Sequence, residues 1–246
     1  MTENKNDPCQ ELTSPRRVNY YTGMLLSEAD LRQEQSYQRE KSRQHLRYLH
    51  GYGTVCGLQV VPYGSEKPAF IKVEPGLALD RWGREIIVPQ AAELDLEAYA
   101  HDAGGALFVV LEYKETPVDQ HPTPGAVPEA ETSSPARVLE TFELLVRDKP
   151  PETSRHSNTG FNEILKKARS GKLDAERLHQ LLCEYVIQPC EPCASDPGVA
   201  LAKVTFPPKG PVTRVDIDNC TYRPIALPTN LLMEILVETL RDQPEL

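Results

Sequence analysis

The sequence predicts an α+β fold: a mainly antiparallel β domain, sandwich-like or barrel-like, with a polar N-terminal helix, an inserted helical pair and a C-terminal helix. Two observations predict this class. The 246 residues include 22 prolines against 14 glycines, which favours many short elements joined by rigid turns over a helical bundle. Strand-like segments also follow one another in runs separated by short turns, which indicates antiparallel pairing rather than alternation with helices.

The N-terminal helix is predicted over residues 28–50. Residues 1–17 read as a disordered arm, and Ser27 with Asp30 three positions later forms an acidic variant of the capping box. No Gly or Pro interrupts 28–50, and the helix ends at Gly51. Its apolar content is thin, so it is either solvated and laced with charge pairs or placed between domains or subunits. The interface residues predicted on it are Leu31, Tyr37, His45 and His50.

Strands are predicted next, completing a helix-plus-β region over 18–116. Residues 54–63 and 69–74 are rich in β-branched residues, and 106–113 is the most apolar segment and is expected to be central. Residues 77–80 and 85–89 flank a turn in which Gly83 supplies a positive φ, which predicts a hairpin.

The second half, 136–246, is predicted to continue the same β domain. Residues 117–135 hold five prolines and read as a long loop or extended arm. After a strand at 137–147 comes a helical insertion at 150–190, with short helices at 161–170 and 174–186. A strand pair at 199–206 and 212–216 and a helix capped by Thr229 close the chain. We expect one compact domain overall.

Composition excludes several classes of partner. The net charge of −9 argues against binding to nucleic acid or to an anionic membrane, since both need a concentrated basic patch. No apolar run approaches the roughly 18–20 residues that span a bilayer, so no direct membrane insertion is expected. The first fifteen residues lack the pattern of a signal peptide. We therefore expect a soluble protein made in the cytoplasm, with cysteines kept as thiols or metal ligands rather than disulfides.

Cys190 and Cys193 form the sharpest chemical motif, a Cys-x-x-Cys pair in a loop. Two thiols at this spacing can bind one tetrahedral zinc ion, and Cys183 and Cys220 would complete a structural site. Two other interpretations stay open: redox exchange, although the pair does not open a helix, and simple packing or exposure of the thiols. The expected cofactor is thus none, or one structural zinc.

Other polar groups have simpler explanations than catalysis. His45 and His50 are five residues apart, about 500° around an α-helix, so they are expected on different faces. Asp80 with Glu85 could suit glycosidase chemistry, but a β-turn that begins with Asp explains the same residues. Trp82, the sole tryptophan, is either a core residue or an interface anchor, and its place at the tip of the turn favours the interface. The chain also lacks the common nucleophile, phosphate-loop, dinucleotide and metalloprotease motifs, so no enzyme activity is predicted.

A family resemblance covers most of residues 18–232. It is carried by YYTGMLL at 20–26, by LHGYGTVCGLQV at 49–60, by PGLALD at 75–80 and by ETFEL at 140–144. These segments resemble a family of mostly uncharacterised proteins associated with gene clusters for phage-tail-like contractile injection systems. Where the resemblance implies a cysteine ahead of Pro135, this chain has Ser133 and Ser134.

The resemblance implies a structural or adaptor subunit near the baseplate, spike or cap of such a particle, whether released or attached to a membrane. The expected partners are other subunits of the assembly or further copies of this chain. Two alternatives of other classes remain: a particle-associated enzyme such as a cell-wall hydrolase, and a zinc-stabilised adaptor. A pocket that gathers carboxylates or histidines would favour the enzyme, and metal content would favour the zinc-stabilised adaptor.

Overall fold

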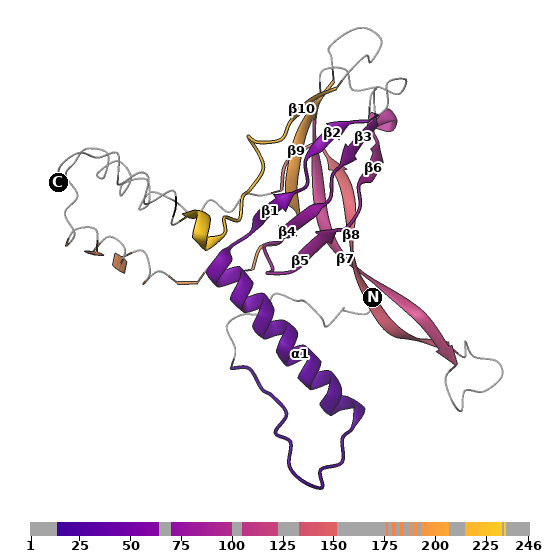
Figure 1. Cartoon of the computed structure of the whole chain (residues 1–246), viewed down its shortest axis with the longest axis vertical. Coiled ribbons are helices and arrows are strands. Elements are labelled where there is room, and N and C mark those ends of the chain that lie inside the picture. Colours follow the sequence, from indigo (N-terminus) through magenta and orange to yellow (C-terminus); the bar gives the residue numbers. More distant parts are fainter. Residues whose placement is uncertain are drawn as a thin grey trace.

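The computed structural model describes residues 14–63, 70–99, 105–122, 133–151, 193–206, 215–232 and 234, with several single positions between 176 and 190. The helical elements are α1 (Glu28–His45), the π-helical turn η1 (Leu46–His50) and the 3-10 turn η2 (Glu97–Tyr99). The strands are β1 (Gly53–Gly57), β2 (Val60–Pro62), β3 (Phe70–Val73), β4 (Gly76–Leu79), β5 (Glu85–Val88), β6 (Ala92–Asp95), β7 (Ala106–Pro122), β8 (Ser133–Arg147), β9 (Val199–Thr205) and β10 (Asp216–Asp218). Figure 1 shows their arrangement.

The strands form three antiparallel sheets, which confirms the predicted α+β class. Their orders are β1-β4-β5, β2-β3-β6 and β10-β9-β7-β8, and among the described strands none closes into a barrel. The predicted hairpin is formed by β4 and β5, with φ of 78° at Gly83. The apolar segment predicted to be central is the start of β7, which lies between β8 and β9.

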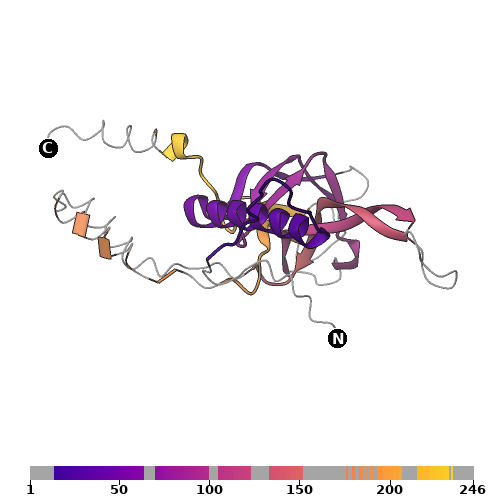
Figure 2. The same ribbon diagram turned by 90° about the horizontal axis from the view of Figure 1, so that it is seen from below.

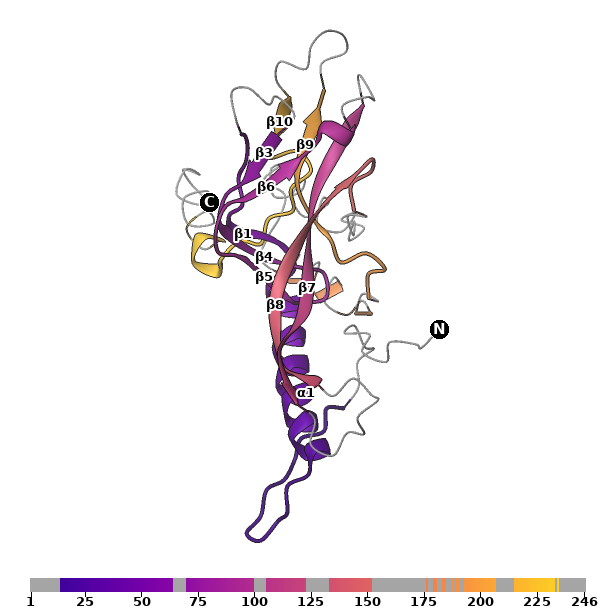
Figure 3. The same cartoon turned by 90° about the vertical axis from the view of Figure 1, so that its right-hand side faces the viewer.

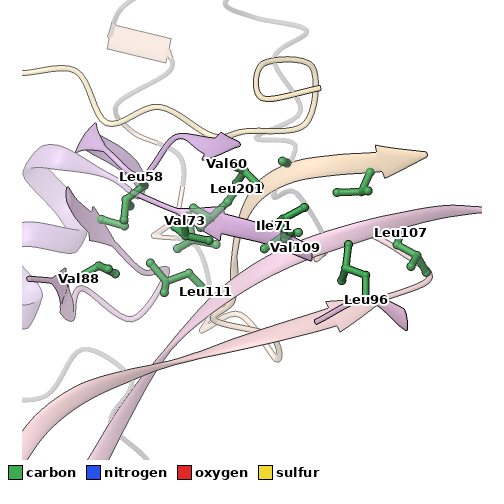
Figure 4. Close-up of a cluster of buried hydrophobic side chains, with 14 of the residues drawn as sticks. Leu58, Val60, Ile71, Val73, Val88, Leu96, Leu107, Val109, Leu111 and Leu201 are labelled. Carbon is green, nitrogen blue, oxygen red and sulfur yellow. The ribbon is translucent and has the colours of Figure 1, made fainter. Parts of the chain in front are cut away.

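The core lies where the two three-stranded sheets meet the four-stranded sheet. Figure 4 shows side chains of β2 and β3 packed against those of β7 and β9. Because β7 and β9 are covered on both faces, consecutive residues are buried: Leu107 to Leu111 on β7, and Val199 to Ala202 on β9. Fully buried members of the cluster include Leu58, Val60, Ile71, Val73, Ile86, Leu96, Val109, Leu111, Leu201, Val204 and Phe206.

The prediction of a single strand over 54–63 is wrong, because this segment divides into two strands of different sheets. β1 pairs with β4, whereas β2 pairs with β3. Between them the backbone of Gly57 and Leu58 is left-handed, with φ of 64° and 57°. Two successive left-handed residues redirect the chain, and they bury the Leu58 side chain completely.

Part of the segment predicted as a loop at 117–135 is strand. β7 continues to Pro122 and β8 begins at Ser133, with Pro117 opposite Val138 and Pro135 opposite Gln120. β9 pairs with β7 only as far as Leu111, so among the described strands the distal part of the hairpin is two-stranded and both its strands are edges. Proline is tolerated at an edge because no ladder hydrogen bond is needed on the open side. Residues 123–132 lie outside the described part of the chain.

The predicted helices of the second half are described only in part. The helix at 161–170 lies outside the described residues, as do most positions of the helix at 174–186; residues 176, 179, 180, 183 and 184 are helical. The last helix begins at Thr229 and is described for 229–232 and 234, where it stands apart from the strands (Figure 2). Among the described helices, none has the length and apolar character that a bilayer crossing requires.

Candidate interaction surface

Helix α1 projects from the β domain on the same side as the β7–β8 hairpin (Figure 3). It begins at the predicted capping box: Ser27 Oγ accepts from the Asp30 N–H at 3.2 Å, and Asp30 Oδ2 accepts from the Ser27 N–H at 2.9 Å. The Ser27 hydroxyl also donates to Asp30 Oδ2 at 2.6 Å, and this bond, followed by that from the Ser27 N–H, holds the pKa of the Asp30 carboxyl below its ordinary value. The structure describes every residue of α1 and buries none of them. A helix with this exposure is held by its cap and by charge pairs rather than by a core.

Contacts along α1 match the solvated helix that its sequence predicts. Arg32 bonds to Glu28, Gln38 to Glu34 and Ser36 to Glu40, each four residues apart. Each such pair contributes only about 0.2–0.5 kcal/mol. Of the residues predicted at an interface, Leu31 is 53% exposed, His45 and His50 are exposed, and Tyr37 is half-buried. Their role as contacts stays a prediction.

The segment before α1 carries four exposed large apolar side chains, among them Leu25, the most exposed one in the described part of the chain. A turn from Tyr21 to Met24, with Gly23 at φ 86°, reverses the backbone and is closed by a 3.1 Å bond from the Met24 N–H to the Tyr21 carbonyl. Gln33 of α1 donates to the Arg16 carbonyl and holds the segment against the helix. The exposed fractions are 52% for Tyr20, 68% for Tyr21, 93% for Leu25 and 54% for Leu26. We call residues 20–26 the apolar tip.

The sequence interpretation missed the apolar tip as a contact surface. Five large apolar residues in seven were read as an approach to the helix, although no strand or helix pattern offered them a place in the core. Contiguous exposed apolar residues on a soluble protein mark binding sites more often than chance exposure. The tip therefore joins the candidate surface.

The end of α1 is fixed to the β domain through the β4–β5 turn. The Gly83 Cα lies so close to the backbone of Arg43 that a Cβ at this position would collide with the Arg43 carbonyl. Arg43 Nη2 also lies 3.7 Å from Glu115 Oε1 on β7. These contacts attach the C-terminal end of α1 to the β domain. The N-terminal end of α1, which follows the apolar tip, lies away from this attachment.

The Asp80 side chain closes the β4–β5 turn. This is the structural role expected of an Asp that begins a β-turn. Its side chain is 1% exposed; Oδ1 accepts from the N–H groups of Trp82 and Arg84 at 2.8 Å, and Oδ2 accepts from Arg84 Nε at 2.5 Å. Burial raises the pKa of the carboxyl, and the Arg84 charge opposes that rise. Glu85 is exposed on β5.

Trp82 packs within the chain rather than projecting from the turn. Its indole N–H donates to the Ala194 carbonyl at 2.8 Å. The Arg84 guanidinium lies 4.5 Å from the Trp82 ring centre and 4.6 Å from that of Tyr113 on β7. The half-buried indole therefore joins the turn to β7 and to residue 194, and its predicted role as an interface anchor stays untested.

The four cysteines predicted to bind zinc do not form one cluster. Cys183, Cys190 and Cys220 are exposed free thiols, whereas Cys193 is half-buried, belongs to a disulfide and accepts a hydrogen bond from Arg47. Within the described residues, no three His, Cys, Asp or Glu side chains come close enough to hold one metal ion. The disulfide differs from the expectation of thiols or metal ligands, and structural zinc stays an untested prediction.

Two polar residues that the sequence analysis did not single out join the distant ends of the fold. Arg223 donates to the carbonyls of Leu201 at 2.8 Å, Leu58 at 2.7 Å and Gly57 at 3.3 Å. The Asn219 amide pairs with both backbone groups of Val60, at 2.8 and 2.9 Å. These contacts fasten residues 219–226 over β1 and β2. No local pattern signals them, because the partners lie more than twenty residues away.

A shallow groove of about 440 Å³ lies between β2 and β10. Its lining residues are Gln59, Val60, Val61, Pro62, Val215, Asp216, Ile217 and Asn219. It gathers one carboxylate and no histidine, so it does not present the acid–base pair that a hydrolase site would need.

Comparison with known proteins finds similarity only to solved structures, at low sequence identity. No family model and no curated protein matches the chain. Among solved structures it is similar to a chain of the type VI secretion system TssK-TssF-TssG baseplate subcomplex, with TM-score 0.44 and 12% identity, covering 93% of this chain and 69% of that one.

Two further solved structures are similar to the same degree. The baseplate complex from the type VI secretion system gives TM-score 0.44 and 11% identity over 93% of this chain and 66% of that one. The crystal structure of TssK gives 0.41 and 11% over 94% and 51%. This chain spans about two thirds of the first two matched chains and about half of the third. These values carry no functional assignment.

Proposed function

We propose that this protein is a structural subunit of a phage-tail-like contractile injection system, bound to other subunits through the apolar tip and α1. The observation that supports the proposal is the exposure of the apolar tip. Leu25 at 93% exposure and Tyr21 at 68% place large apolar surfaces in water at the end of a helix that has no core of its own. Burial of such side chains contributes about 1.5–3 kcal/mol each, so docking of the tip would supply substantial binding energy.

The kind of particle follows from the sequence resemblance. One of the segments that resemble the injection-system family is YYTGMLL at 20–26, which is the apolar tip itself. The second segment, GTVCGL at 53–58, has a different task. A Cβ on Gly53 would lie 2.6 Å from the Pro224 carbonyl carbon, and Thr54 exchanges backbone bonds with Pro224 and Ala226. One segment thus builds the body of the protein, and the other is free to contact a partner.

We further propose that the protein acts by contact and not by catalysis. Support comes from the groups that could have formed an active site. Asp80 is engaged by Arg84 and by backbone N–H groups, and Glu112 and Asp196 both bind Arg147. Carboxylates held in this way stabilise the fold.

Particle assembly tests the proposal. In cells that produce the particle, Leu25→Asp combined with Tyr21→Asp is expected to leave the chain folded, because both side chains are exposed, and to remove it from purified particles. Glu85→Gln is the control, since it removes an exposed charge on β5, outside both the apolar tip and α1. Circular dichroism of the purified variants checks the fold. Incorporation of the tip variant at the wild-type level would contradict the proposal.

A further inference from the structure

Most sheet edges among the described strands are protected from pairing with another chain. On β2, the Asn219 side chain occupies the outward N–H and C=O of Val60, and Pro62 has no N–H to offer. β1 is covered by residues 224–226 through the bridge between Thr54 and Ile225. β6 and β10 are short and acidic, with four and three residues. Short, charged, covered or proline-bearing edges resist pairing with another chain.

β5 has four residues and an exposed Ile87, and only β4 pairs with it; β8 is the longest open edge among the described strands. It has 15 residues, and in the described part of the chain only β7 pairs with it, so its other edge is open. From residue 136 to Arg147 it contains no Pro, Gly or Lys. The facing strand β7, by contrast, carries Pro117 and a left-handed Asp119 at φ 55° in its distal part. The longest edge among the described strands is thus free of Pro and Gly over this stretch, although it carries the charged residues Arg137 and Glu140.

Among the described strands, no third one pairs with the distal part of the β7–β8 hairpin. Beyond Leu111 the pairs continue from Glu112 opposite Glu143 to Pro122 opposite Ser133, and β9 no longer accompanies them. A two-stranded ribbon is marginal in water. Here Val138 and Leu139 are 57% and 54% exposed although they lie on opposite faces of the ribbon. An added strand would cover apolar surface on both faces.

The carboxylates of the ribbon indicate which side chain an added strand would carry. Glu115 and Glu140 lie directly opposite each other across the ribbon, and like charges at this position are destabilising. The Tyr113 hydroxyl donates to Glu115 at 2.9 Å, and Arg43 reaches Glu115 at 3.7 Å. The Tyr113 hydroxyl also interacts with the Glu140 carboxylate, so one neutral donor lies between the two like charges. A basic side chain on a strand beside β8 would face Glu140 and offset the repulsion.

We propose that the open edge of β8, over residues 136–141, binds an extended segment of a partner protein by strand addition, with a lysine or arginine of that segment opposite Glu140. The main-chain hydrogen bonds of β8 supply affinity, and Glu140 with the flanking Val138 and Phe142 supplies selectivity. This surface is separate from the apolar tip, and the proposal does not depend on the kind of particle.

Two probe peptides test the site on the full-length protein. Each has nine residues of alternating threonine and valine, with lysine at the centre of one and glutamate at the centre of the other. We expect the lysine peptide to bind roughly fivefold more tightly than the glutamate peptide, as measured by calorimetry. Hydrogen exchange is expected to slow at the amides of 136–141.

Charge reversal separates strand addition from general attraction. Glu140→Lys is expected to reverse the preference, so that the glutamate peptide binds more tightly, and to fold normally because it removes a like-charge pair. Glu85→Lys makes the same charge change on an exposed position of β5 and is expected to leave the preference unaltered. No binding of the lysine peptide at 1 mM, an unchanged preference in Glu140→Lys, or exchange protection on another strand would each overturn the proposal. None of these results would affect the apolar tip, whose test is incorporation into particles.

Discussion

The imidazole rings of His45 and His50 lie with their centres 5.5 Å apart, although α-helical geometry would place residues five apart on different faces. The backbone from Leu46 to His50 is a π-helix, whose i to i+5 bonding widens the turn and brings His50 beside His45. The prediction of separate faces was therefore wrong, because it assumed a constant 100° per residue. The turn ends at Gly51 with φ 74°.

The π turn has a direct spectroscopic consequence. In protein labelled selectively at histidine, we expect a nuclear Overhauser effect between the rings of His45 and His50, because their centres are 5.5 Å apart. His50→Gln assigns the signal by removing it. If both rings are seen without any mutual effect, the helix is α-helical through this region and the described geometry is contradicted.

Replacement of Gly83, in the β4–β5 turn, is expected to destabilise the protein. Gly83→Ala would strain a left-handed φ of 78° and push a methyl group into the Arg43 carbonyl, so the helix and the turn would have to separate. We expect a loss of about 2–4 kcal/mol in the free energy of unfolding, measured with urea.

Gly23→Ala is the matched control for Gly83. Its φ of 86° is also left-handed, but nothing lies within 4 Å of the added Cβ. Only the local strain of about 1–2 kcal/mol applies, and it falls on an exposed turn. Equal losses of global stability in the two variants would contradict the close approach of Gly83 to Arg43.

Asp218 is expected to make stability depend on pH below 4. Bonds from the Thr221 side chain and backbone, together with the Cys220 N–H, lower the pKa of its carboxyl to about 2. A folded-state pKa below the unfolded value means that the stabilisation is present above pH 4 and is lost as pH falls toward 2. Urea unfolding of wild type and Asp218→Asn across this range is expected to show a difference that shrinks on acidification. A constant difference would show that Asp218 does not titrate in this way.

Local signals in the sequence were enough for the elements that depend on neighbouring residues. The capping box at Ser27 and Asp30, the hairpin closed by Gly83 and the central position of the strand at 106–113 all follow from spacing within a few residues. The α+β class is confirmed on the same grounds.

Features set by distant contacts could not be predicted in this way. The division of 54–63 depends on a left-handed Leu58, which an isolated leucine avoids and which its complete burial stabilises here. The exposure of the apolar tip could not be foreseen either, because apolar residues in a sequence do not reveal whether the core has room for them. The contacts of Arg223 have no local pattern at all.

Arg223 is expected to be the residue on which attachment of 219–226 to the β domain depends most. Its guanidinium donates to three carbonyls, of Leu201, Leu58 and Gly57, and to Asn219 Oδ1 at 2.9 Å. Burial lowers its pKa, yet the group remains charged because an arginine keeps its proton in proteins. Arg223→Met keeps much of the volume but leaves partly buried carbonyls without a donor, which costs about 1–3 kcal/mol for each group left unsatisfied. Arg223→Lys can restore only part of this, because one ammonium cannot reach three separate carbonyls. Urea unfolding is expected to rank wild type above Lys and Lys above Met, with a total loss of about 3 kcal/mol or more for Met. Equal stability of Lys and wild type would mean that charge alone, and not the forked geometry of the guanidinium, fastens this segment.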